Sequence, residues 1–252
     1  MPATLFIVTG SSRGLGAAML RQLLRPDAVV LGIARRSTAD LAAAALARSA
    51  RLEQWQHDLA EAVPVAQRLQ RWLAEFEPTD FAQATLINNA GSVTDPAPAA
   101  DSDLAAMASA LRVTLEATVV LTAAFLRATR AWTGPRRVLN ISSGLGRRAM
   151  AGSAAYCAAK AGMDHFSRAV ALEEANLRHG ARIVSLAPGV IDTDMQAQLR
   201  AADPAGFADR ATFVQLKESG QLLSAEAAAE RVLAWLARPD FGSQPVADVR
   251  DT

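Results

Sequence analysis

Leu5-Phe6-Ile7-Val8-Thr9-Gly10-Ser11-Ser12-Arg13-Gly14-Leu15-Gly16 is the stretch from which we predict the fold. Its first four residues are a short, continuous apolar run, typical of a strand buried on both faces of a parallel sheet. The glycines let the backbone approach an anion closely, and a helix beginning there directs free N–H groups at the same point. The spacing is G-x-x-x-G-x-G rather than the general dinucleotide pattern G-x-G-x-x-G, so a simple tight turn is the alternative interpretation.

The rest of the chain repeats this alternation of strand and helix. We predict further strands at 28–34, 52–56, 85–87, 137–142, 182–186 and 246–249. We predict helices from the glycine turn to about residue 25 and at about 38–48, 61–77, 101–129, 153–178 and 224–237, the last capped by Ser224. This order predicts an α/β fold with a doubly wound, Rossmann-type, mostly parallel sheet and helices on both faces, in a single domain over 1–252. Residues 190–220, read as irregular, are predicted to form a substrate lid, because long loops in compact domains are usually functional.

Composition narrows the classes of function. Of the 252 residues, 51% are hydrophobic and the net charge is +1, which indicates a globular protein and gives no electrostatic reason to expect nucleic acid or a membrane as partner. No stretch approaches the ~18 uninterrupted apolar residues of a membrane-spanning helix. The single cysteine, Cys157, excludes an internal disulfide and, with no signal-peptide pattern, predicts a cytoplasmic protein. We predict no metal site.

Residues suited to ligand binding recur where the predicted strands end. Parallel strands place their carboxyl ends at one edge, where ligands bind in such sheets, so we expect these residues to share a site. Arg35 and Arg36 follow the second strand without an acid at the strand end, which favours the 2′-phosphate of NADP(H) over the ribose hydroxyls of NAD. Solvated charges are the alternative. Asp58, after the third strand, suits either an adenine amino group or a helix N-cap.

Tyr156 and Lys160 are spaced to lie on one face of a helix. A nearby cation favours a phenolate, so we expect Lys160 to lower the pKa of the phenol and to suit it to proton transfer near neutral pH. The Ser143 hydroxyl could reach the same substrate oxygen if its strand ends beside that helix. The alternative interpretation is that Tyr156 and Lys160 are ordinary neighbours on one helix face, because most Tyr-x-x-x-Lys pairs have no catalytic role.

Five motifs, in order, resemble those of the short-chain dehydrogenase/reductase family over almost the whole chain. They are the glycine turn at 9–16, Asn88-Asn89-Ala90-Gly91, Ser143 thirteen positions before the tyrosine, Tyr156 with Lys160, and Pro188-Gly189 with Thr193. Segments 140–144, 155–157, 160–162, 188–198 and 216–220 look like those of the bacterial benzil reductases, NADPH-dependent enzymes related to sepiapterin reductase.

The resemblance implies a role for each matching residue. Tyr156 would donate a proton to a carbonyl oxygen, Ser143 would hydrogen-bond that oxygen, and Lys160 would hold the nicotinamide ribose. Thr193 and the backbone of Ile191 would fix the carboxamide. The cofactor-binding residues implied in this way are Gly10, Ser12, Arg13, Gly14, Leu15, Gly16, Arg35, Arg36, Asp58, Leu59, Asn89, Ala90, Gly91, Tyr156, Lys160, Pro188, Gly189, Ile191 and Thr193.

The function implied is an NADPH-dependent carbonyl reductase acting on a small apolar or aromatic ketone, with 1,2-diketones such as benzil as candidates. A pterin side-chain ketone or an acyl-thioester ketone stays open as substrate. One departure from the family pattern is Thr114, at the position of an asparagine that supports a water linked to the active-site lysine. It keeps open a dinucleotide-binding regulator without catalysis. The resemblance also implies a homo-oligomer, a dimer or tetramer, paired through helices 101–129 and 153–178.

Overall fold

The computed structural model describes residues 3–204 and 206–251, where the chain forms a parallel sheet in the order β3-β2-β1-β4-β5-β6-β7. The chain reverses its direction of travel across the sheet between β1 and β4, which is the switch point at which doubly wound sheets bind ligands. The strands are β1 (Ala3–Thr9), β2 (Ala28–Ala34), β3 (Arg51–Gln56), β4 (Phe81–Asn88), β5 (Arg136–Ile141), β6 (Arg182–Ala187) and β7 (Val246–Asp248).

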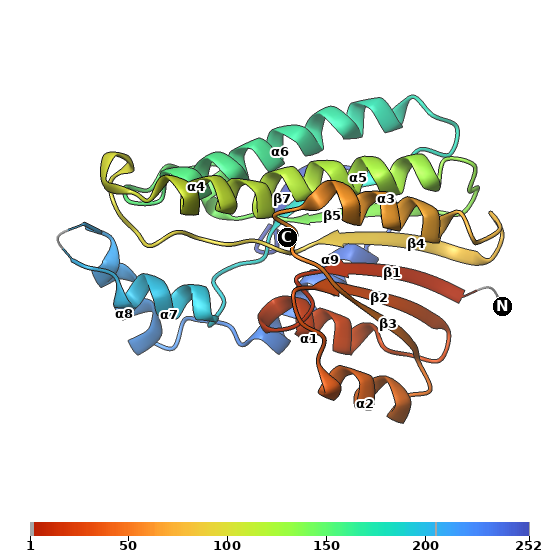
Figure 1. The fold of residues 1–252 in the computed structure, drawn as a ribbon, viewed down its shortest axis with the longest axis horizontal. Coiled ribbons are helices and arrows are strands. Elements are labelled where there is room, and N and C mark those ends of the chain that lie inside the picture. The colour runs from red at the N-terminus through yellow and green to blue at the C-terminus, as the bar shows by residue number, and fades with distance from the viewer. Residues whose placement is uncertain (1–2, 205, 252) are drawn as a thin grey trace.

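Helices cover both faces of this sheet, as predicted. Figure 1 shows α3, α4, α5 and α6 on one side and α1, α2 and α9 on the other. Their bounds are α1 (Gly14–Leu23), α2 (Ala39–Ala47), α3 (Ala62–Leu73), α4 (Leu104–Leu111), α5 (Ala117–Ala128), α6 (Ala154–Ala175), α7 (Asp194–Ala201), α8 (Arg210–Glu218) and α9 (Ala225–Ala237). The α/β, doubly wound interpretation is therefore confirmed.

The apolar runs are explained by burial on both sides. In β1, Leu5 and Ile7 belong to the core under α3 and α5, whereas Phe6 and Val8 belong to the core under α1 and α9. Successive side chains of a strand point to opposite faces, so a strand with two covered faces needs no polar alternation. The second strand has the predicted bounds, and Ser224 caps α9 by accepting a hydrogen bond from the N–H of Ala227 at 3.1 Å.

Several boundaries differ from those predicted. The stretch 190–220 is not irregular, because it contains α7 and α8, which lie beyond the carboxyl ends of the strands (Figure 1). The helix expected at 61–77 ends at Leu73, and β4 begins at Phe81 rather than at residue 85.

The helix expected at 101–129 begins at Leu104, and a five-residue π-helical turn, η2 (Arg112–Glu116), separates α4 from α5. The segment Leu104–Ala128 is long and apolar enough to cross a membrane by length and composition. Arg112, Glu116 and Arg127 interrupt this segment, so the expectation that no stretch reaches ~18 uninterrupted apolar residues stands. The segment packs against α3 and α6 over the sheet, so we interpret it as a covering helix.

Candidate active site

The glycine turn after β1 has the shape and the free donors of an anion site. Gly10 and Gly14 have φ angles of 66° and 53°, in the left-handed region that favours glycine. A Cβ atom at Gly10 would stand 2.9 Å from Cα of Ala90, so the turn and the loop after β4 touch backbone to backbone. Helix α1 begins without a side-chain cap from Arg13, which leaves N–H groups of its first turn for a ligand.

The loop after β4 is attached to that turn. The N–H groups of Asn89 and Ala90 donate to Oγ1 of Thr9 at 2.9 and 3.0 Å. The amide nitrogen of Asn89 donates to the carbonyl oxygen of Thr9 at 3.0 Å and more weakly to that of Gly10 at 3.4 Å. The side chain of Asn89 thus holds the cradle together, and the implied contact with a ribose falls to its backbone and to Ala90.

The start of α7 lies over the same turn. A Cβ atom at Gly14 would stand 3.7 Å from Cγ2 of Thr193, and Arg13 forms an ion pair with Asp194. Further back, Ile191 forms a β-bridge with Leu223, which fixes the segment that follows β6. The predicted carboxamide contacts at 191–193 therefore adjoin the predicted phosphate turn.

The predicted adenosine contacts lie farther out. Arg35 and Arg36 are exposed at the carboxyl end of β2 and have no side-chain partner within 3–204 and 206–251. Leu59 is buried in the core, so only its backbone is free to face a ligand. The N-cap alternative for Asp58 is wrong. Its Oδ1 accepts a hydrogen bond from the N–H of Ala60 at 3.0 Å, in a turn, and the N-cap of α3 is Glu61.

Ser143, Tyr156 and Lys160 meet where β5 ends beside α6. Burial raises the pKa of the Tyr156 phenol to about 12, and a hydrogen bond with Ser143 opposes that rise. The expected lowering of this pKa by Lys160 is wrong. The ammonium lies 5.5 Å from the centre of the Tyr156 ring and donates to the carbonyl oxygen of Ile141 at 2.7 Å. Desolvation therefore sets the direction of the shift, and the phenol keeps its proton at neutral pH.

Lys160 is itself buried, with 3% of its surface exposed. Burial lowers the pKa of its ammonium to about 8, and the negative charge of Asp164 opposes that fall. The amine is therefore mainly charged at pH 7, and its pKa lies only about one unit above that pH.

Thr114 lies beside this group, inside the π-helical turn. A Cβ atom at Gly91 would stand 3.6 Å from Oγ1 of Thr114 and 3.7 Å from Nζ of Lys160, so both atoms face the same point of the loop after β4. Oγ1 of Thr114 accepts a hydrogen bond from the N–H of Ser92 at 3.1 Å. The predicted proximity of position 114 to the lysine agrees with this geometry.

A family model described as short chain dehydrogenase matches residues 4–204. The chain belongs to the short-chain dehydrogenase family.

This short-chain dehydrogenase is 34% identical over 235 residues to benzil reductase ((S)-benzoin forming) of Bacillus cereus, covering 93% of this chain and 94% of the relative. It is 31% identical over 270 residues to sepiapterin reductase of Rattus norvegicus, covering 97% and 95%. A crystal structure of a short-chain dehydrogenase/reductase from Burkholderia vietnamiensis matches with a TM-score of 0.67 at 35% identity, covering 99% of this chain and 98% of that one. The family resemblance is thus confirmed, and the family binds a nicotinamide dinucleotide.

Sequence reasoning missed one polar group of this short-chain dehydrogenase. Asp164, one turn after Lys160 on α6, is buried and accepts hydrogen bonds from the hydroxyls of Ser142 and Ser185 at 2.6 and 2.7 Å. Arg147 faces its second oxygen at 3.2 Å. The signal that could have revealed it is an acid that repeats the four-residue spacing of Tyr156 and Lys160.

The segment predicted to form a lid contributes Leu199, Phe207 and Phe213 to a separate apolar cluster, which also contains Met150. Leu145 and Cys157 pack against this cluster, and they are close in sequence to Ser143 and Tyr156. The rings of Phe207 and Phe213 stack with centroids 5.6 Å apart. These apolar side chains therefore pack helices α7 and α8 and the loop between them against one another.

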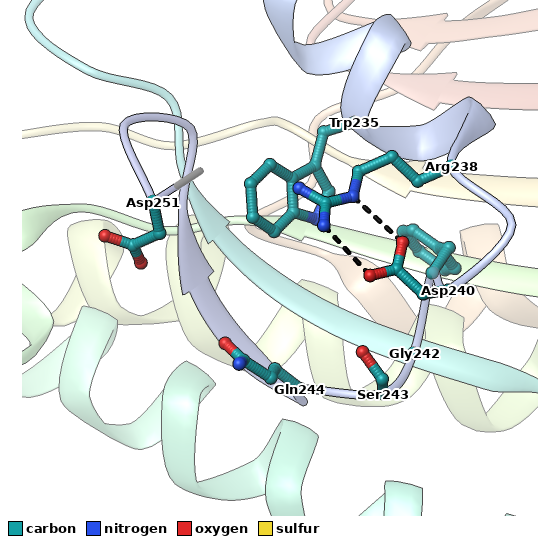
Figure 2. Close-up of a pocket in the computed structure, with 8 residues that line it drawn as sticks. Trp235, Arg238, Asp240, Gly242, Ser243, Gln244 and Asp251 are labelled. Atoms are coloured by element: carbon teal, nitrogen blue, oxygen red, sulfur yellow. Dashed lines mark hydrogen bonds and ion pairs between the residues drawn. The ribbon is translucent and has the colours of Figure 1, made fainter.

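A cavity of about 80 Å³ lies elsewhere in this short-chain dehydrogenase, beside the loop that leads from α9 into the amino end of β7. Figure 2 shows the guanidinium of Arg238 paired with Asp240 beside the ring of Trp235. The cavity contains none of the predicted site residues. Among residues 3–204 and 206–251, no group of three His, Cys, Asp or Glu side chains could hold a metal ion.

Proposed function

We propose that this protein is an NADPH-dependent carbonyl reductase that acts on a small apolar or aromatic ketone, including 1,2-diketones such as benzil. The observation that carries the proposal is the meeting of Ser143, Tyr156 and Lys160 where β5 ends beside α6. The ammonium of Lys160 lies 5.5 Å from the centre of the Tyr156 ring and is anchored to the carbonyl oxygen of Ile141 at 2.7 Å, and the phenol beside it is protonated at neutral pH. A phenol that still holds its proton suits a reduction, in which a carbonyl oxygen must receive one.

Each side chain has a role in this proposal. Tyr156 donates its proton to the carbonyl oxygen as negative charge develops there, and Ser143 donates a hydrogen bond to the same atom. Lys160 holds the nicotinamide ribose with its ammonium. When bound, reduced nicotinamide supplies the hydride. Val190 and Met195, which are half-buried and flank the segment 191–193, favour a substrate without strong charge.

The preference for NADP(H) over NAD(H) is supported by Arg35 and Arg36. They are exposed at the carboxyl end of β2 with no side-chain partner within 3–204 and 206–251, so their charges are available to a 2′-phosphate. Arg13, in the glycine turn, is paired with Asp194, so to bind a phosphate it would have to give up that carboxylate.

A cytoplasmic location and a homo-oligomer belong to the same proposal. The lone, partly buried thiol of Cys157 suits a reducing compartment. Leu104 on α4 and Leu172 on α6 are 79% and 71% exposed, and pairing through these long helices would cover them. Sedimentation equilibrium measures the state. A monomer at micromolar concentration would contradict the pairing.

The test of the activity is to mix the protein with NADPH and benzil and to follow the absorbance of the reduced nicotinamide. We expect its loss together with formation of a hydroxyketone. A panel with a pterin side-chain ketone and a 3-oxoacyl thioester separates the alternative substrates. Binding of NADPH without consumption of any ketone would instead support the regulator.

A further inference from the structure

The carboxylate of Asp164 connects two segments that carry the catalytic group. It lies on α6, the helix of Tyr156 and Lys160, with 1% of its surface exposed. Its Oδ1 accepts the hydroxyl hydrogen of Ser142, the residue immediately before Ser143, at 2.6 Å. One buried acid thus ties the helix that carries the phenol and the amine to the strand end that carries the serine.

The same carboxylate holds two more segments. Ser185, on β6, donates to Oδ1 at 2.7 Å, and Arg147, in the turn after Ser143, donates from Nε to Oδ2 at 3.2 Å. Nη2 of Arg147 continues to the carbonyl oxygen of Ala247, on β7, at 2.9 Å. A Cβ atom at Gly146 would stand 2.8 Å from Oδ2 of Asp164, so this turn lies directly on the carboxylate.

Asp164 is also the negative charge next to Lys160 on its own helix, where its field favours the charged amine. The other charged or titratable groups on α6 are Tyr156, Cys157, His165, Arg168, Glu173 and Glu174. Those on the elements packed against α6, or directly after them, are Arg147 and Arg148 after the short 3-10 turn η3 (Gly144–Gly146), Arg112 and Glu116 on η2, Arg127 on α5, Arg182 on β6, and Asp248 and Arg250 on and after β7. Of these, Arg147 is the cation in contact with Asp164, and Asp248 pairs with Arg250.

We propose that Asp164 is a positioning residue for the reduction: it fixes the turn that carries Ser143 and supplies the counter-charge of Lys160. The inference rests on the proposed function for its kinetic consequence, but not for its electrostatic one. Neutralising Asp164 should remove a negative charge that stabilises the buried ammonium of Lys160, so the amine should lose its proton at a lower pH. Neutralising Arg147 should have the opposite effect.

The chain makes this measurable, because its lysines are Lys160 and Lys217 alone. The full chain labelled with [ε-13C]lysine gives two side-chain signals, and Lys217→Arg assigns them. Following them against pH needs no ketone turnover. We expect Asp164→Asn, which keeps the shape of the side chain, to move the midpoint of the Lys160 signal down by about 1 pH unit. We expect Arg147→Gln, at a side chain one-third exposed, to move it up.

Glu174→Gln is the matched control. Glu174 is also a buried acid on α6, paired with Arg136, and lies ten residues, or about 15 Å along the helix, from Asp164. We expect it to lower the free energy of unfolding without moving the Lys160 midpoint.

The same variants assayed with NADPH and benzil give the kinetic arm. The activity of Asp164→Asn relative to wild type should fall as the pH rises, to about one-fifth at pH 8 if the midpoint falls by one unit. An unmoved Lys160 midpoint in Asp164→Asn overturns the inference, whether or not benzil is reduced. If that variant does not fold, the absence of an upward shift in Arg147→Gln overturns it. Absence of ketone reduction together with the expected NMR shifts would contradict the proposed function alone.

Discussion

The ammonium of Lys160 donates a hydrogen bond to the carbonyl oxygen of Ile141 at 2.7 Å, so the amine is anchored to the strand beside the tyrosine helix. The bond satisfies one of its three donors in a buried place. Its other two N–H donors do not take part in this bond. Near Gly91, in the loop after β4, Oγ1 of Thr114 and Nζ of Lys160 face the same point.

The burial of Lys160 predicts how stability depends on pH. Its folded-state pKa, about 8, lies below the ordinary 10.5, so between these values the unfolded chain binds more protons and wild-type stability rises with pH. Lys160→Met lacks this contribution. The unfolding free energy of the variant minus that of wild type should therefore fall by at most about 3 kcal/mol between pH 7 and 10.5. Urea denaturation measures it, with Lys217→Met as control. A constant difference would contradict the lowered pKa.

Tyr156→Phe removes the proposed acid and little else. Turnover of a ketone substrate should fall by about 10²–10⁴-fold, whereas the dissociation constant for NADPH should stay within about threefold. Steady-state kinetics and fluorescence titration give the two numbers. Activity equal to wild type would remove the phenol from the mechanism.

Arg35→Ala should weaken NADPH binding by about tenfold or more and leave NADH binding nearly unchanged, because a charge-assisted bond to the 2′-phosphate is lost. Isothermal titration at fixed ionic strength measures both. Arg51, exposed at the amino end of β3, provides the control variant Arg51→Ala. An unchanged preference after Arg35→Ala would mean that another residue contacts the phosphate.

Two glycines of one turn should respond differently to alanine. At Gly146 the new methyl would overlap Asp164 and the backbone of Lys160, whereas at Gly144 no atom lies within 4 Å. Gly146→Ala should therefore lower the free energy of unfolding by about 1–3 kcal/mol and reduce turnover, with Gly144→Ala close to wild type. Thermal unfolding and steady-state kinetics of both variants make the comparison. Equal effects would mean that the turn shifts to accommodate a methyl group at Gly146.

Thr114→Val should show what the hydroxyl contributes. The N–H of Ser92 would lose its acceptor, so the free energy of unfolding should fall by about 1–2 kcal/mol, while Thr114→Ser should keep most of it. Chemical denaturation of both variants makes the comparison. A destabilised Thr114→Ser would point to packing of the methyl group instead.

The sequence predicted the layers and the meeting of strand ends because buried strands and glycine turns leave strong local patterns. β2 is apolar throughout its predicted bounds, since both of its faces are covered. Helices α7 and α8 were missed because they are short and bury few side chains, Gln196 and Leu199 in one and Phe213 in the other. So few positions give no repeating stripe.

The meeting of Ser143, Tyr156 and Lys160 was predictable from their spacing, but the electrostatics of the group were not. The pKa of Tyr156 is raised by burial and lowered by its hydrogen bond with Ser143, and both effects depend on tertiary structure. The role of Asp58 also depended on the point at which α3 begins, which moved the cap to Glu61.

The π-helical turn at Arg112–Glu116 adds about one residue to the winding of its helix, which rotates everything after it by about 100°. The apolar side of α4, which meets α6, is thus not continued by the apolar side of α5, which meets α3. A straight helix with a single apolar face could pack against only one of these neighbours. The rotation at the π-helical turn lets one continuous helical segment pack against α6 with its first half and against α3 with its second.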